Sequence, residues 1–193
     1  MSGTVDREGY RYIPGPFQYS AGVAALPGHA IERVRFANPV PLGEGFHRIE
    51  TFLRDAGLPL TAFCACELRS PAPFTDAGFI AFNREYVGTL ERWGLVANDR
   101  NPVGRSNVCP EIDPPDTPSF HAFCYVTPAA NAVHSFVCAG SGESQEGTGP
   151  YRDKTIRYGE TTPDAIEEKA RYVLGVMEKR MAFGHGRSGL HRA

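Results

Sequence analysis

The chain has 193 residues, of which 41% are hydrophobic, enough to form one domain with a buried core or one domain with an extension. Its 20 Lys and Arg residues are balanced by 22 Asp and Glu residues, so the formal net charge is -2 at pH 7. That balance argues against a nucleic-acid partner. The polar start and the lack of any apolar run of about 18 to 20 residues argue against a signal sequence or membrane span. We therefore expect a soluble, cytoplasmic protein.

The cysteines and histidines do not form metal-binding patterns. There are five cysteines, an odd number, and Cys64-Ala65-Cys66 lacks the Cys-x-x-Cys spacing of a zinc knuckle. No two of the six histidines are four residues apart, and the glycine-rich segment 140–149 lacks the Gly-Lys-Ser/Thr of a phosphate loop. We expect free thiols, no metal and no cofactor.

The first third predicts a loose arm, two strands and a helix. Residues 1–14 form the arm, in which Tyr10 and Tyr12 alternate and could add an edge strand. Strands at 19–25 and 30–36 flank Leu26-Pro27-Gly28-His29, a turn pattern that predicts a hairpin. A helix ending at Gly57 follows, with an apolar face made of Phe46, Ile49, Leu53 and Ala56.

The middle of the chain predicts a buried strand, a second helix and two more strands. Residues 60–68 are mostly apolar, as in a strand buried on both faces. Thr75 is the expected cap of the helix, whose apolar stripe is Phe79, Phe82, Tyr86, Leu90 and Trp93. Strands at 105–109 and 120–126 complete the order β-β-α-β-α-β-β. This order predicts an α+β fold with helices packed on one face of a mixed sheet.

The last third predicts an extension of that fold. We expect strands at 133–139 and 154–158 on either side of the loop 141–150, then a helix from Thr162-Pro163-Asp164 to Gly184. The predicted organisation is a domain at 1–128, a β-β-α extension at 129–185 and a disordered tail at 186–193. We interpret the extension as a partial, diverged second copy of the first unit. The alternative is that it is an unrelated C-terminal addition.

Arg105 is the centre of the candidate site. It lies in Pro102-Val103-Gly104-Arg105-Ser106-Asn107-Val108-Cys109-Pro110, a short strand entered and left through turn residues. A guanidinium matches a carboxylate through two parallel hydrogen bonds. Pairing with a carboxylate of the chain itself is the structural alternative. Glu67 and Arg69 share a strand face and are expected to pair, with Arg69 as an alternative second carboxylate anchor.

Several motifs in order resemble the RidA (YjgF/YER057c/UK114) family of reactive-intermediate deaminases, once labelled endoribonuclease L-PSP. They are Gly15-Pro16-Phe17, the segment 19–23, the helix end at 53–58, Phe82-Asn83-x-x-Tyr86 and Arg105-Ser106-Asn107-Val108. The resemblance covers about residues 15–128. It implies a RidA/chorismate-mutase-like fold and a homotrimer whose clefts lie between subunits.

The resemblance also implies the chemistry, which is hydrolysis of an imine or enamine of a 2-amino acid to a 2-keto acid and ammonia. Arg105 would hold the substrate carboxylate, and fixing it beside an ordered water would supply much of the rate. Asn107 replaces the family's cysteine, and His121 replaces its usual glutamate. The candidate acids are therefore His121 and Glu143 in the loop of the extension, and the structural alternatives are a packed strand histidine and a solvated loop glutamate. The candidate substrate-binding residues are Arg105, Tyr19, Asn83, Tyr86, Asn107, Cys109 and Phe120.

Three functions remain open from the sequence. The first is a C=N hydrolase acting on a small carboxylated imine, with an aminomuconate-type deaminase as the variant that would explain the altered acid. The second is a chorismatase-like enzyme acting on a cyclic carboxylate, and the third is a non-catalytic metabolite-binding oligomer. Ribonuclease activity follows only from the old family label, and the acidic balance argues against it.

Overall fold

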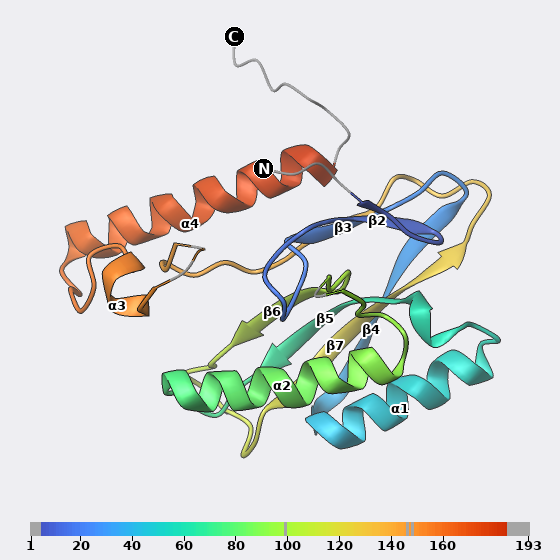
Figure 1. Cartoon of the computed structure of the whole chain (residues 1–193), viewed down its shortest axis with the longest axis horizontal. Coiled ribbons are helices and arrows are strands. Elements are labelled where there is room, and N and C mark those ends of the chain that lie inside the picture. Colours follow the sequence, from blue (N-terminus) through green and yellow to red (C-terminus); the bar gives the residue numbers. More distant parts are fainter. Residues whose placement is uncertain (1–4, 99, 146, 148, 185–193) are drawn as a thin grey trace, which may run out of the picture.

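The computed structural model describes residues 5–98, 100–145, 147 and 149–184 (Figure 1). In chain order the elements are β1 Val5–Asp6, β2 Tyr10–Ile13, β3 Gly22–Ala25, β4 His29–Pro41, α1 Leu42–Asp55, η1 Leu60–Ala62, β5 Phe63–Arg69, α2 Asp76–Arg92, β6 Gly104–Val108, β7 Ser119–Pro128, β8 Phe136–Cys138, α3 Tyr151–Lys154 and α4 Pro163–Gly184. The predicted tail 186–193 lies outside the described residues.

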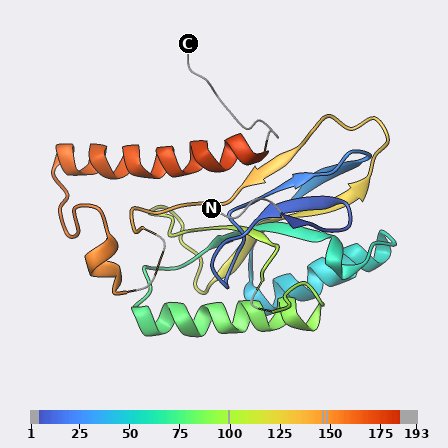
Figure 2. The same cartoon turned by 45° about the horizontal axis from the view of Figure 1, so that its top comes forward.

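The main sheet has the order β4-β7-β5-β6 and is mixed, because β5 and β6 are parallel while the other pairs are antiparallel. Helices α1 and α2 lie on one face of it (Figures 1 and 2). Phe46 of α1 joins the layers, since its ring packs edge-on against Trp93 at 5.3 Å and Phe120 at 4.9 Å. The α+β fold with helices on one face of a mixed sheet is therefore confirmed.

The predicted hairpin is wrong. Strand β3 belongs to a second sheet with the order β1-β2-β3-β8, whereas β4 pairs with β7 in the main sheet. The turn between them has a hydrogen bond of 3.0 Å from the His29 N–H to the Leu26 carbonyl, with Pro27 second and Gly28 third at φ +81°. Those positions suit a type II turn, which splays its flanking strands instead of pairing them.

The second sheet covers part of the other face of the main sheet. The described part of the predicted arm forms β1 and β2, and the side chain of Tyr10 in β2 is fully buried. Burial and the neighbouring Cys64 thiol of β5 raise the pKa of Tyr10 above its ordinary value. Gly9, at φ +81°, approaches so closely that a Cβ there would lie 3.0 Å from Val126 of β7. One hydrophobic core therefore includes Tyr10, Tyr12 and Val23 together with β5 and α2.

The extension differs from the predicted β-β-α order. Its first strand is shortened to β8, which pairs with β3, and the long helix α4 ends at Gly184 as expected. The second strand, predicted at 154–158, is instead the end of α3 followed by a turn. Arg157 has a left-handed φ of +49°, which interrupts an extended chain, and its guanidinium pairs with Glu160, Asp164 and Glu168.

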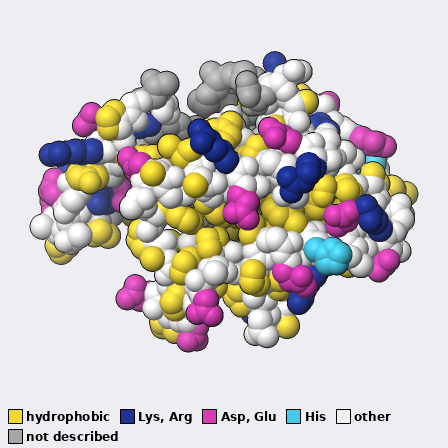
Figure 3. Space-filling model, turned by 60° about the horizontal axis from the view of Figure 1, so that its bottom comes forward, with side chains coloured by type: hydrophobic (Ala, Val, Ile, Leu, Met, Phe, Trp, Pro, Cys, Tyr) yellow, Lys and Arg dark blue, Asp and Glu magenta, His cyan; other side chains and the backbone are white. Residues whose placement is uncertain are grey.

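Helix α4 lies on the opposite side of the molecule from α1 and α2 (Figure 2). No helix among the described residues is long and apolar enough to cross a membrane. On the face shown in Figure 3, side chains of both charges are interspersed around hydrophobic ones. That face therefore lacks the single-sign field typical of a nucleic-acid surface.

Candidate functional site

Alternation along β6 directs Arg105 toward α2. A Cβ on Gly104 would contact Val23 of the second sheet, so the next residue faces the opposite side, where α2 lies. Arg105 is in register with Cys66 of β5, and the Cys66 thiol is 3.3 Å from the Tyr86 hydroxyl of α2. The Arg105 side chain is thus enclosed between the edge of the main sheet and α2.

Three aromatic rings surround the Arg105 guanidinium. Its central carbon lies 4.8 Å from the ring centroid of Tyr86, 5.5 Å from that of Tyr19 and 5.6 Å from that of Phe82. Only 4% of the residue is exposed. We call Arg105 with these three rings the arginine cage. Each contact between a cation and the face of an aromatic ring is favourable by about 0.5 to 2 kcal/mol.

No carboxylate among the described residues neutralises the charge of Arg105, and its Nη1 is buried without a hydrogen-bond partner. Burial lowers the pKa of Arg105, while the neighbouring Tyr86, Cys66 and Tyr19 act in the opposite direction. An unpaired buried cation is costly, so the cage is suited to receive an anion.

The ionisable groups next to the Arg105 guanidinium favour their neutral forms. Burial raises the pKa of the Cys66 thiol to about 12, and burial also raises the pKa of Tyr86 well above its ordinary value. Asn83 of α2 is buried and donates from Nδ2 to the Phe79 carbonyl at 2.8 Å, while its Oδ1 is buried without a partner. The Asn83 amide group therefore has a structural hydrogen bond within α2, and its Oδ1 remains available as an acceptor.

The N-terminal loop brings Tyr19 to the cage. Ser20 forms a parallel bridge with Gly104, and its N–H donates to the Val103 carbonyl at 2.8 Å. Ser20 Oγ also donates to the Pro102 carbonyl at 3.1 Å. These bonds fix the residue next to Tyr19 directly against the strand that carries Arg105.

A cavity of about 600 Å³ lies on the other side of Tyr19, within the range typical of small-molecule sites. We call it the extension pocket, because half of its lining comes from the C-terminal extension. Its aromatic side chains continue from the cage: Phe74 stacks on Phe82 at 5.0 Å, and Phe79 packs edge-on against Tyr151 at 6.4 Å. The full lining is Pro16, Gln18, Tyr19, Pro73, Phe74, Asp76, Phe79, Gly142, Glu143, Ser144, Gln145, Gly147, Tyr151 and Lys154.

Glu143 is the sequence-predicted acid that lines this pocket. Its main-chain carbonyl accepts from the Ile156 N–H at 3.0 Å, and Ser144 forms a bridge with Thr155, so the loop is tied to the segment after α3. The carboxylate lies 3.9 Å from the Lys169 ammonium of α4, and 47% of the Glu143 side chain is exposed. The Glu143 carboxylate is therefore partly exposed where its residue lines the pocket.

His121 lies elsewhere in the same chain. Phe120 faces α1, so the next side chain of β7 points to the opposite face of the main sheet from Arg105. Burial lowers the pKa of His121, nearby Arg69 lowers it further, and Glu67 acts in the opposite direction. Arg33 forms two hydrogen bonds with Glu67, of 2.5 and 3.1 Å, and Arg69 lies 3.7 Å from Glu67 as expected. His121 belongs to this charged group and does not line the pocket.

Three of the predicted substrate-binding residues lie outside both the arginine cage and the lining of the extension pocket. Phe120 is fully buried in the core against Phe46. Asn107 faces the same side as Arg105, but its Oδ1 accepts from Ser70 Oγ at 3.0 Å. Cys109 follows β6 and is an exposed free thiol. The structure thus brings Tyr19 and Tyr86 to Arg105, places Asn83 nearby on α2, and places Glu143 in the adjoining pocket.

Sequence reasoning missed the role of Phe82 and the pocket residues Phe74, Tyr151 and Lys154. Phe82 belongs to the Phe-Asn-x-x-Tyr motif, four residues before Tyr86 and therefore on the same side of α2, which could have identified it. Lys154 gave no such signal, because its segment was expected to be a strand.

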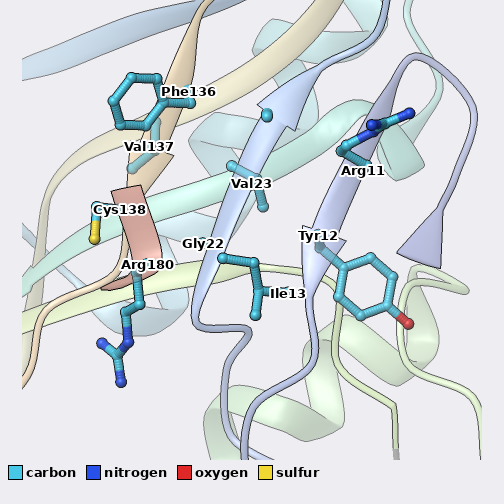
Figure 4. A pocket seen from close by; sticks show the side chains of 10 residues that line it. Arg11, Tyr12, Ile13, Gly22, Val23, Phe136, Val137, Cys138 and Arg180 are labelled. Carbon is cyan, nitrogen blue, oxygen red and sulfur yellow. The ribbon is translucent and has the colours of Figure 1, made fainter. Parts of the chain in front are cut away.

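The extension is attached directly to the strand that carries Arg105. The Gly140 N–H donates to the Arg105 carbonyl at 3.2 Å. The buried Arg180 of α4 donates from Nη1 to the carbonyls of Ala139 at 3.1 Å and Gly140 at 2.8 Å. Figure 4 shows Arg180 next to Cys138, among the residues that line a cavity of about 10 Å³. That space suits one water molecule and no larger ligand.

Comparison with known proteins identifies the family. A YjgF-family protein from Neisseria meningitidis is similar in structure over 64% of this chain and 97% of its own, with 18% identity and a TM-score of 0.30. The 2-amino-5-chloromuconate deaminase of Comamonas testosteroni is 54% identical over 175 residues, covering 90% of this chain and 70% of the relative. The model of the 2-aminomuconate deaminase family CnbZ matches residues 3–191, nearly the whole chain. The chain therefore belongs to the CnbZ family of 2-aminomuconate deaminases.

Proposed function

We propose that this protein deaminates a 2-amino-2-enoate of the aminomuconate type, holding the carboxylate next to the amino carbon at Arg105. The buried, unpaired guanidinium carries the proposal, because a carboxylate is the group that would neutralise it and use its planar fork. The relative from Comamonas testosteroni, named as a deaminase of a chlorinated aminomuconate, supports the choice of substrate.

The substrate enters through the extension pocket. Tyr19 lines both the pocket and the arginine cage, so its ring turns aside when the carboxylate reaches the guanidinium. Protonated Glu143 donates its proton to C3 of the enamine while the nitrogen lone pair completes a C=N bond, and the resulting iminium ion is electrophilic at C2. Closing the aromatic walls around it excludes bulk water and strengthens the attraction between the carboxylate and Arg105.

Hydrolysis then needs one base and one acid, and we assign both roles to Glu143. Its carboxylate takes a proton from water as the water oxygen bonds to C2, giving a carbinolamine. It returns that proton to nitrogen, the C–N bond breaks with its electron pair leaving on ammonia, and Glu143 takes the hydroxyl proton as that oxygen forms the carbonyl, which restores its carboxylic acid. The products are a 2-keto acid and ammonia, and no external oxidant or reductant is consumed.

We also propose a homotrimer, as the RidA resemblance implies. In that assembly the charged group around His121 would face a neighbouring subunit. Mass determination in solution tests this part separately from the chemistry.

The experiment is ammonia release from freshly generated 2-aminomuconate, followed for the wild type, Arg105→Met and Arg105→Lys. We expect release by the wild type, near-complete loss in Arg105→Met and a large loss in Arg105→Lys, because an ammonium cannot reproduce the two parallel bonds. The matched control is Arg152→Met, at an exposed arginine outside the pocket lining. Turnover by Arg105→Met equal to the wild type would refute the assigned role of Arg105, and binding without turnover by the wild type would favour a metabolite-binding protein.

A further inference from the structure

Lys154 is the one cationic side chain among the described residues that line the extension pocket. It is the last residue of α3, in a segment that the resemblance to RidA does not cover. Its position is fixed, since Nζ donates to the Gly147 carbonyl at 2.6 Å and lies 5.2 Å from the centroid of the Tyr151 ring. The ammonium is therefore held at the wall that the extension contributes.

The pocket lining has one cation that could bind an anionic ligand, Lys154, and two carboxylates that could repel such a ligand, Glu143 and Asp76. Glu143 is partly neutralised by Lys169, whose Nζ lies 3.9 Å from it. Asp76 is exposed in the first turn of α2, where the positive end of the helix dipole offsets its charge. Lys154 has no carboxylate partner among the described residues and remains able to bind an anion.

The walls between the two cations are aromatic. Phe74 and Phe79 of the α2 end and Tyr151 of α3 line the pocket beside Tyr19. Flat, apolar walls favour a planar, unsaturated carbon chain. One cation, Lys154, thus lies in the extension wall of the pocket, and a second, Arg105, lies beyond Tyr19 outside the pocket lining.

We propose that Lys154 binds the distal carboxylate of an unsaturated dicarboxylate whose 2-amino end is held at Arg105. This inference rests on the proposed function, because it takes Arg105 as the first anchor. Lys154 is then a specificity residue: it selects dicarboxylates over monocarboxylates of the same chain length. The extension supplies this selection.

The test compares binding of cis,cis-muconate with that of 2,4-hexadienoate, which has the same six-carbon chain and one carboxylate. Calorimetry on the full chain gives both affinities for the wild type, Lys154→Met, Lys154→Arg and the control Arg152→Met. We expect Lys154→Met to lose roughly 10- to 100-fold in affinity for muconate, as for a hydrogen bond to a charged group, and to bind hexadienoate unchanged. Lys154→Arg keeps the preference for muconate, which excludes a folding defect as the cause.

Equal affinity of the wild type for the two ligands, or unchanged muconate binding by Lys154→Met, would overturn the subsite. Ammonia release from 2-aminomuconate is measured in parallel. A wild type that releases no ammonia but prefers muconate through Lys154 would refute the proposed function and leave the subsite standing. If the wild type releases ammonia and Lys154→Met keeps the wild-type affinity for muconate, the proposed function stands and the subsite is refuted.

Discussion

Replacing Arg105 with methionine should abolish activity without a large loss of stability. Removing a buried arginine from an ion pair costs about 3 to 5 kcal/mol, because its partner is left buried and charged. Arg105 has no such partner among the described residues. Methionine has a similar length and fills irregular apolar space.

The opposing free energies are of similar size. Three aromatic contacts at 4.8 to 5.6 Å stabilise the cation by about 1.5 to 6 kcal/mol in total, at about 0.5 to 2 each. The effective cost of moving a guanidinium out of water is several kcal/mol. We therefore expect the free energy of unfolding of Arg105→Met to lie within about 2 kcal/mol of the wild-type value.

The assay is urea unfolding followed by circular dichroism, with and without cis,cis-muconate. Ligand at 100 times its Kd should stabilise the wild type by about 2.7 kcal/mol and Arg105→Met by far less. A destabilisation of Arg105→Met by about 3 kcal/mol or more without ligand would refute the reasoning, because it would show that the chain itself compensates the charge.

The remaining predictions concern the acid, the extension and acid stability. Glu143→Gln should lower kcat for ammonia release by about 10²- to 10⁴-fold, while His121→Ala stays near the wild type; a larger loss in His121→Ala would contradict the assignment of the acid. Arg180→Met should lower the free energy of unfolding by about 1.5 to 3 kcal/mol in urea, since two carbonyls lose a charged donor; an unchanged urea midpoint would show that α4 is held by other contacts. The hydrogen bond from Arg33 lowers the pKa of Glu67 in the folded state. The pair therefore stabilises the fold at pH values above the ordinary glutamate pKa of about 4.3. That stabilisation is lost as the pH falls through the lower pKa of the folded state. Glu67→Gln should therefore flatten this part of the acid-unfolding profile, and a profile identical to the wild type would exclude the pair as its cause.

The main sheet and its helices were predictable because each signal is local. The stripe of α2, its Thr75 cap with a 3.1 Å bond from the Gly78 N–H, and the left-handed Gly57 after α1 all follow from spacing and turn chemistry. The split between two sheets was not predictable in this way. The turn before His29 brings the chain from one sheet to the other, and strand pairing depends on partners distant in sequence, such as β8 for β3.

The site was predictable at its centre and not at its edge. Arg105, Tyr19 and Tyr86 lie in recognisable motifs, and the structure brings them together. Lys154 was missed because the left-handed Arg157 and its three carboxylate partners stop the segment from being a strand. Such a conformation depends on contacts with α4, which single-residue preferences do not encode.

The hydrogen bond between the Gly140 N–H and the Arg105 carbonyl has an evolutionary consequence. It joins two segments that can change at different rates: the strand under the guanidinium, constrained by a packed core, and the loop and short helix beyond Gly140, which are mostly exposed or half-buried. If the extension pocket holds the substrate as proposed, substitutions at 141–158 would alter which substituents on the carbon chain are accepted without disturbing Arg105. Relatives that process differently halogenated compounds would then be expected to diverge in that segment first.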